Sequence, residues 1–131
     1  MKSKSYRLGV GIMLLNEKNK VFVGKRKDIK SDAWQMPQGG VNKGEKDEVA
    51  AFRELYEETG VKKVKIISKS KKFYKYNIPI SLKKKLWNGE YIGQKQKWFI
   101  MRFTGNEKKD INLNIKNREF LDWKWINIED L

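Results

Sequence analysis

Residues 39–61 read GGVNKGEKDEVAAFRELYEETGV, and this stretch decides the fold. Its apolar residues recur with a helical period over Asp47–Thr59, which predicts a helix. One side of that helix is apolar and is its predicted buried stripe, made of Val49, Phe52, Leu55 and Tyr56. Gly60 follows directly and is the residue at which we expect the helix to end, because glycine tolerates the left-handed conformation.

The opposite side of the predicted helix is acidic. Glu54, Glu57 and Glu58 fall within an arc of about 100°, since positions three and four apart are neighbours. Ala50 shares the arc and leaves room above the carboxylates, and Arg53 stands one turn before Glu57 and can orient it. Like charges at these spacings cost roughly 0.2–0.5 kcal/mol per pair, and a divalent cation turns the repulsion into coordination. For three glutamates alone, a solvated acidic face is the preferred explanation.

The wider spacing favours the metal site. It follows the pattern G-x5-E-x7-R-E-(apolar)-x-E-E-x-G-(apolar), with the fixed positions Gly39, Glu45, Arg53, Glu54, Leu55, Glu57, Glu58, Gly60 and Val61. At ordinary residue frequencies such a match arises by chance with a probability well below ~10⁻⁷. The pattern resembles the Nudix box, so the chain is similar to the Nudix hydrolases. The resemblance implies an α+β fold, a Nudix α/β/α sandwich with a mixed central sheet and a loop–helix–loop catalytic motif. It also implies hydrolysis of a nucleoside diphosphate linked to another group.

The resemblance assigns roles to the residues of the box. The implied metal ligands are the carboxylates of Glu54, Glu57 and Glu58, together with a backbone carbonyl of Gln38 or Gly39. The implied catalytic residues are Glu57 or Glu54, as the proton acceptor, and Arg53, which positions the carboxylates. The supporting residues are Gly39, Glu45 and Gly60. The chain contains no His, so a carboxylate base is nearly forced and a metal needs oxygen ligands. We expect two or more Mg²⁺ ions, with Mn²⁺ as a substitute.

Flanking segments resemble one branch of the family over about residues 6–131. They are the pair Tyr6-Arg7, WQMPQGG at residues 34–40, GQKQKWF at residues 93–99, and EFLDWKW at residues 119–125. Together they are similar to the bacterial RNA pyrophosphohydrolases and to the asymmetric dinucleoside tetraphosphate hydrolases. In that branch Glu119 corresponds to a further carboxylate at the metal cluster, and its alternative is an ordinary Glu at the start of a strand.

The branch also implies a set of substrate-binding residues: Arg7, Arg26, Lys95 and Lys97 near the phosphates, and Tyr76 stacked on a base. Lys95 and Lys97 share one face of their strand by alternation. The alternative for them is a pair of edge-strand lysines that prevent aggregation. For Tyr76 and its neighbour Phe73 the alternative is a packed or half-buried strand, and for Phe73 this alternative is preferred.

Composition places weaker constraints on the domain organisation, partners and location of the protein. The 131 residues suit a single domain over residues 1–131. The formal charge of +14 attracts polyanions such as nucleic acid, although codon bias in a genome rich in A and T explains the lysines equally well. The absence of Cys fits the cytoplasm, and no apolar run is long enough for a membrane span. We expect a monomer or a weak homo-oligomer.

Around the predicted helix the sequence predicts mostly strands. They are Arg7–Leu15, Val21–Lys25, Val64–Lys69, Phe73–Ile80, Lys97–Thr104 and Leu121–Ile128, with loops at Ser31–Gly44 and Asp110–Arg118. The final residues resemble the opening of another helix, and we expect the chain to be truncated before the helix with which the branch covers its sheet.

Three functions fit these expectations. The first is removal of pyrophosphate from the 5′ end of triphosphorylated RNA, towards which the positive charge tilts the choice. The second is asymmetric hydrolysis of dinucleoside tetraphosphate to ATP and AMP. The third, a catalytically inactive RNA- or nucleotide-binding module, is disfavoured because every glutamate of the box is present.

Overall fold

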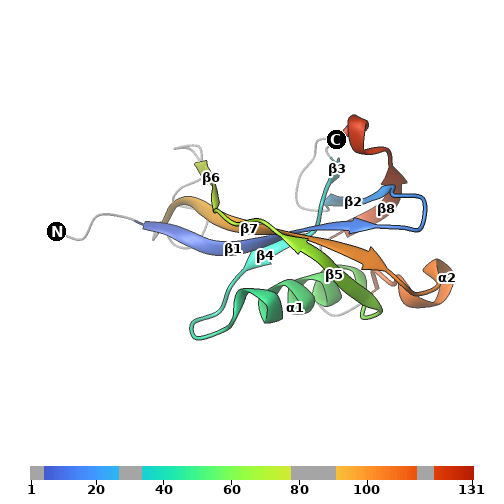
Figure 1. Ribbon diagram of the computed structural model, residues 1–131, viewed down its shortest axis with the longest axis horizontal. Coiled ribbons are helices and arrows are strands. Elements are labelled where there is room, and N and C mark those ends of the chain that lie inside the picture. The colour runs from blue at the N-terminus through green and yellow to red at the C-terminus, as the bar shows by residue number, and fades with distance from the viewer. Residues whose placement is uncertain (1–4, 27–33, 78–90, 115–119) are drawn as a thin grey trace.

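The computed structural model describes residues 5–26, 34–77, 91–114 and 120–131 (Figure 1). Its strands are β1 (Ser5–Leu15), β2 (Val21–Arg26), β3 (Trp34–Gln35), β4 (Gln38–Gly40), β5 (Val64–Lys69), β6 (Tyr74–Asn77), β7 (Tyr91–Phe103) and β8 (Phe120–Ile126). Its helices are α1 (Asp47–Thr59), the four-residue α2 (Glu107–Asp110) and the 3-10 turn η3 (Ile128–Asp130).

One mixed sheet contains all the described strands, in the order β3-β2-β1-β7-β5. The central strands β1 and β7 run parallel, and the other pairs are antiparallel, with β4 added to β1, β6 to β7 and β8 to β2. Helix α1 lies across one face of this sheet (Figure 1). The expected α+β Nudix architecture is therefore confirmed. Within the described ranges, no long helix covers the opposite face.

The two faces of β1 differ in side-chain size. Val10, Ile12 and Leu14 are fully buried on the face that packs against α1. The alternate positions Gly9 and Gly11 point to the opposite face, because successive strand residues alternate. A Cβ at Gly11 would lie 2.6 Å from the ring of Trp98, so glycine there lets the indole pack directly on the backbone.

Helix α1 has the predicted ends. It spans Asp47–Thr59, and Gly60 follows with φ 75°, donating its N–H to the carbonyl of Tyr56 at 2.8 Å. Within the described residues, no helix is long and apolar enough to cross a membrane.

The predicted buried stripe of α1 is wrong except for Leu55. Val49, Phe52 and Tyr56 are 53%, 41% and 41% exposed, and the buried residues are instead Ala50, Ala51, Leu55, Glu58 and Thr59. Ala50 was expected within the acidic arc, but it is fully buried in the core. The physical reason is close packing: small side chains bring the helix backbone near the sheet, and contacts from its polar side fix its rotation.

Several strand boundaries also differ from expectation. The predicted loop over residues 31–44 contains β3 and β4, because it pairs with β2 and β1. Strand β7 begins at Tyr91 rather than Lys97, since it pairs in parallel with β1 from Ser5 onwards. The predicted strand over residues 73–80 is observed as Tyr74–Asn77, and its last three residues lie outside the described ranges.

Candidate active site

The loop before α1 is held to both the sheet and the helix. Strand β4 pairs with β1, placing Gly39 opposite Val10. The backbone N–H of Asn42 donates to Oε1 of Glu45 at 3.0 Å, and the N–H of Glu45 donates to the Asn42 carbonyl at 2.9 Å. Gly44 completes the turn with φ 78°, a left-handed conformation that favours glycine. The loop therefore presents Glu45 in a fixed position at the start of the helix.

Arg53 is the centre of the site. Its Nε and Nη2 donate to the two carboxylate oxygens of Glu45, each at 2.8 Å, in the bidentate geometry that matches a planar guanidinium to a carboxylate. Its Nη1 donates to Glu54 at 2.8 Å and to Glu57 at 3.2 Å. Its Nη2 also donates to the backbone carbonyl of Gly40 at 2.7 Å. One side chain thus joins the loop, strand β4 and two box glutamates.

The Glu45–Arg53 pair is strongly polarised. Hydrogen bonds from Arg53, and then from the backbone of Asn42, lower the pKa of Glu45 from 4.5 to about 2. The same pairing raises the pKa of Arg53 further above its ordinary value, so the guanidinium stays charged. The ionised pair is therefore the form that the folded protein favours.

The depressed pKa of Glu45 predicts an acid-dependent loss of stability. A carboxyl whose pKa falls on folding contributes stability above its ordinary value of 4.5, and this contribution disappears as the pH falls towards about 2. In Glu45→Gln this part of the pH dependence should be missing. Thermal melts of both proteins between about pH 5 and pH 3 measure it. Parallel falls in Tm for the two proteins would contradict the assignment.

Glu54 lies directly against the backbone of Gly39. A Cβ built on Gly39 would come within 2.0 Å of the Glu54 carboxyl carbon and of its Oε2. Only a residue without a side chain leaves this space, so the glycine has a steric role at the carboxylate. The Glu54 side chain is 13% exposed, which places it at the edge of the site between helix and loop.

Gly39→Ala is expected to displace the Glu54 carboxylate and lower kcat about 100-fold, since misplacement by about 1 Å costs that much. Steady-state kinetics on a polyphosphate substrate measure the effect. Gly44→Ala is the matched control, because a Cβ there meets nothing within 4 Å and only the left-handed φ of 78° is strained. It should lose about 1 kcal/mol of stability and keep its activity. Equal kcat values for Gly39→Ala and the parent protein would remove the steric role.

The three box glutamates differ sharply in exposure. Glu57 is 54% exposed, Glu54 is 13% exposed, and Glu58 is 2% exposed. Burying a carboxylate is costly unless charge or hydrogen bonds compensate, and a bound cation would supply such charge at Glu58. All the predicted donors are oxygens, the ligand type that Mg²⁺ and Mn²⁺ prefer. The residues therefore fit a hard divalent cation.

The carboxylates of the predicted cluster do not converge on one point. Among the described residues, no three acidic side chains lie together closely enough to hold a metal ion. Glu54 and Glu57 both accept from Nη1 of Arg53, at 2.8 and 3.2 Å. The expected cluster of Glu54, Glu57 and Glu58 is thus brought onto one side of α1 without being gathered around a single point. Glu119 lies outside the described residues.

The predicted substrate-binding residues fall on two faces of the sheet. Lys95 and Lys97 lie on the α1 face, where both amines sit over the ring of Phe73 at 4.8 and 5.0 Å from its centroid. Lys97 also pairs with Asp47 at the start of the helix, at 3.7 Å. Phe73 is 40% exposed, so it serves as a platform for two cations rather than as core.

Arg7 and Tyr76 lie on the opposite face. Nη1 of Arg7 donates to Gln94 at 3.1 Å, and the hydroxyl of Tyr76 accepts from Nε1 of Trp98 at 3.1 Å. The ring of Tyr76 remains 46% exposed, which leaves it accessible for stacking. Arg26 ends β2 opposite Phe120. Alternation along β1 and β7 therefore places Arg7 and the two lysines on opposite faces of the sheet.

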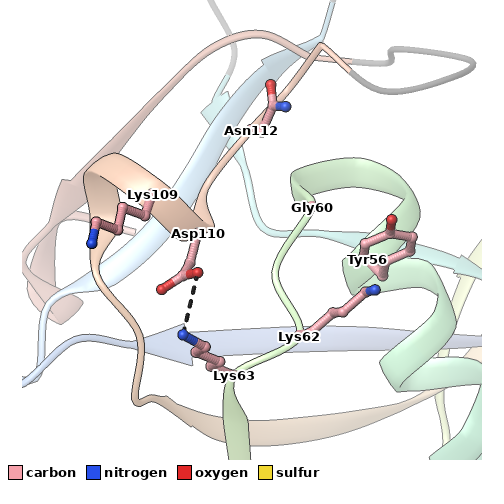
Figure 2. Close-up of a pocket in the computed structure, with 7 residues that line it drawn as sticks. All are labelled: Tyr56, Gly60, Lys62, Lys63, Lys109, Asp110 and Asn112. Carbon is pink, nitrogen blue, oxygen red and sulfur yellow. Dashed lines mark ion pairs between the residues drawn. The ribbon is translucent and has the colours of Figure 1, made fainter.

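A hollow of about 300 Å³ lies beside the C-terminal end of α1 (Figure 2). It is lined by Tyr56, Gly60, Lys62, Lys63, Lys109, Asp110 and Asn112. Its basic groups are largely engaged, since Lys62 lies 4.7 Å from the centroid of the Tyr56 ring and Lys63 pairs with Asp110 at 3.6 Å. None of the predicted substrate-binding residues lines it.

The described residues combine a mixed sheet, a glycine-containing loop, the helix α1 and a set of glutamates organised by an arginine, as expected of a Nudix domain. The chain belongs to the NUDIX domain family, whose sequence profile matches residues 5–131. Nudix hydrolases generally need divalent metal ions. The recognised resemblance to this family is confirmed.

Individual relatives and solved structures are also similar to the chain. The RNA pyrophosphohydrolase of Rickettsia typhi is 54% identical over 126 residues, which cover 96% of this chain and 78% of that protein. Among solved structures, the E. coli dihydroneopterin triphosphate pyrophosphohydrolase has a TM-score of 0.72 at 21% identity, covering 95% of this chain and 84% of that one. A C. elegans Ap4A hydrolase has a TM-score of 0.64 at 18% identity, covering 93% and 81%. These two structures share the fold.

Proposed function

We propose that this chain hydrolyses phosphoanhydride bonds in a metal-dependent reaction and removes pyrophosphate from the 5′ end of triphosphorylated RNA. The observation that carries the proposal is the contact of Arg53 with Glu45, Glu54 and Glu57 beside the buried Glu58. The choice of RNA is supported by the relative in Rickettsia typhi, which is an RNA pyrophosphohydrolase 54% identical to this chain. The net charge of +14 also favours a polyanionic substrate.

The proposed role of each carboxylate follows from its exposure. Glu54, Glu57, Glu58 and Glu119, with a backbone carbonyl of Gln38 or Gly39, would hold Mg²⁺ or Mn²⁺, and we propose two or more ions. When bound, these ions neutralise phosphate charge and make water more acidic. Glu57 is 54% exposed and is the carboxylate best placed to meet water and accept its proton. Arg53 positions Glu54 and Glu57 through its Nη1 group.

The basic and aromatic residues are proposed to bind the rest of the substrate. Arg7 and Arg26 contact phosphates, and Tyr76 stacks on a base from the face opposite α1. Lys95 and Lys97 add positive potential from the α1 face. We propose that the enzyme acts in the cytoplasm, where such RNA ends occur.

Rates on two substrates test the proposal. Triphosphorylated RNA and diadenosine tetraphosphate are compared at equal concentration with Mg²⁺, and the products are separated. Release of pyrophosphate from RNA, with a higher kcat/KM than on the dinucleotide, is the expected result. Faster production of ATP and AMP would assign the chain to dinucleoside tetraphosphate hydrolysis instead. RNA binding that persists in EDTA, with no hydrolysis after Mg²⁺ is restored, would indicate an inactive binding module.

A further inference from the structure

A chain of amide side chains crosses the sheet face opposite α1. Arg7 Nη1 donates to Oε1 of Gln94, and Nε2 of Gln94 donates to Oε1 of Gln96. Nε2 of Gln96 then donates to Oε1 of Gln38 at 3.2 Å. Gln96 is 1% exposed, so the middle of the chain is shielded from water. These hydrogen bonds connect β7 to β4, the strand that carries Gly39.

Arg7 fixes the direction of every bond in this chain. An isolated pair of glutamine amides can hydrogen-bond in either orientation, because oxygen and nitrogen exchange places when the amide turns. A guanidinium only donates, so the Gln94 oxygen must face Arg7 and its nitrogen must face Gln96. The same reasoning forces the nitrogen of Gln96 towards Gln38. The oxygen of Gln38 is therefore committed inwards, and its N–H₂ group forms the outer end of the chain.

Two glycines provide the space for this arrangement. Gly9 and Gly40 face each other across the β1–β4 pair. A Cβ at Gly9 would lie 2.4 Å from Nε2 of Gln94, and a Cβ at Gly40 would lie 2.0 Å from Nη2 of Arg7. Both the first donor and the first amide thus rest on bare backbone. The network is built into the sheet rather than formed by loosely placed surface groups.

We propose that Gln96 is a positioning residue that turns Gln38 so that its N–H₂ group is presented to the phosphates of the substrate. Gln38 shares its sheet face with Arg7 and Tyr76, two residues of the proposed substrate site, and directly precedes Gly39. With the opposite orientation, the amide oxygen would meet a polyanion and repel it. The chain polarises its members in series, which strengthens the terminal donor. The inference rests on the proposed function, because it deepens the recognition of the polyphosphate.

The experiment reverses the orientation of the Gln38 amide. In Gln96→Glu the carboxylate accepts hydrogen bonds from both neighbours, so Gln38 must turn its nitrogen inwards and its oxygen outwards. Gln96→Met is the matched control of similar size, which leaves Gln38 free to turn either way. Binding of inorganic tripolyphosphate in EDTA is measured by calorimetry. We expect Gln96→Glu to weaken binding about tenfold, the loss of one charge-assisted hydrogen bond, and Gln96→Met less than threefold.

A second pair of variants covers the case in which the buried carboxylate of Gln96→Glu prevents folding. Gln38→Glu places an acceptor at the outer end of the hydrogen-bonded series while keeping the hydrogen bond from Gln96, and Gln38→Met is its control. Gln38→Glu should weaken binding at least as much as Gln96→Glu. Equal affinities within either pair would overturn the proposal, since a merely structural link would affect both members alike.

Turnover gives an independent readout. In Gln96→Glu, KM for the polyphosphate substrate should rise about tenfold while kcat changes less than twofold, since the carboxylates are not displaced. A fall in kcat with unchanged KM would contradict the proposal. Tripolyphosphate binding needs no turnover, so a protein that binds it but leaves RNA intact would refute the proposed function and still test this inference.

Discussion

Glu57→Gln is expected to lower kcat about 1000-fold with Mg²⁺ present, because the amide can neither accept the proton from water nor carry charge. The fold should be unaffected. Glu57 is 54% exposed, and its contact with Arg53 at 3.2 Å is an i,i+4 pair on the helix surface. Exposed pairs of this kind contribute between 0 and about 1 kcal/mol. Steady-state kinetics and a thermal melt measure both properties.

Glu48→Gln is the control for this variant. Glu48 lies on the same helix, is 57% exposed, and pairs with Lys69 at 3.5 Å rather than with Arg53. It removes the same charge from the same helix and should leave kcat unchanged. Full activity of Glu57→Gln would overturn its proposed role as proton acceptor, whereas equal losses in both variants would point to a general electrostatic effect.

Arg53→Lys is expected to reduce both stability and activity. Lysine keeps the positive charge but lacks the planar fork of donors. It therefore cannot donate to both oxygens of Glu45 and also to Glu54 and the Gly40 carbonyl. Hydrogen bonds to charged groups contribute about 1.5–3 kcal/mol, and we expect a loss of about 2 kcal/mol in the free energy of unfolding. Released from Arg53, Glu54 and Glu57 are no longer oriented, and kcat/KM should fall about 100-fold.

Arg102→Lys is the matched control for Arg53→Lys. Arg102 also donates to a backbone carbonyl, that of Asn16, but it lies on β7 away from the box. Its replacement should change stability by less than about 1 kcal/mol and leave kcat/KM intact. Urea unfolding and initial rates separate the two effects. Arg53→Lys with normal kcat/KM would show that the glutamates do not depend on the guanidinium for their positions.

The apolar periodicity of α1 predicts the wrong buried face of the helix. Val49, Phe52 and Tyr56 form a regular apolar stripe, yet all three are more than 40% exposed. The core instead receives Ala50 and Leu55, both fully buried. Hydrophobicity alone favours the larger side chains, but Ala50 and Ala51 lie in the core beside Leu55, and their small side chains let the helix pack close to the sheet.

The amide chain could not be recognised from sequence. Gln94 and Gln96 alternate along β7, and Gly9 faces them from β1, but this pattern is also typical of a polar strand face. Their function as a directed set depends on Arg7 and Gln38, which are distant in sequence. Alternation does correctly predict that Lys95 and Lys97 share a face, since that relation is local.

The sequence by itself determined the limits of α1, its Gly60 terminus and the family, because these depend on residue identities at short, fixed spacings. Tertiary structure decided which side of α1 is buried and which sheet face each basic residue occupies. It also decided that Arg53 reaches Glu45 in the loop and the backbone carbonyl of Gly40 in β4. The physical reason is that rotation and facing are fixed by contacts between distant residues, such as the hydrogen bond from Arg53 to the Gly40 carbonyl. No local pattern contains the geometry of such contacts.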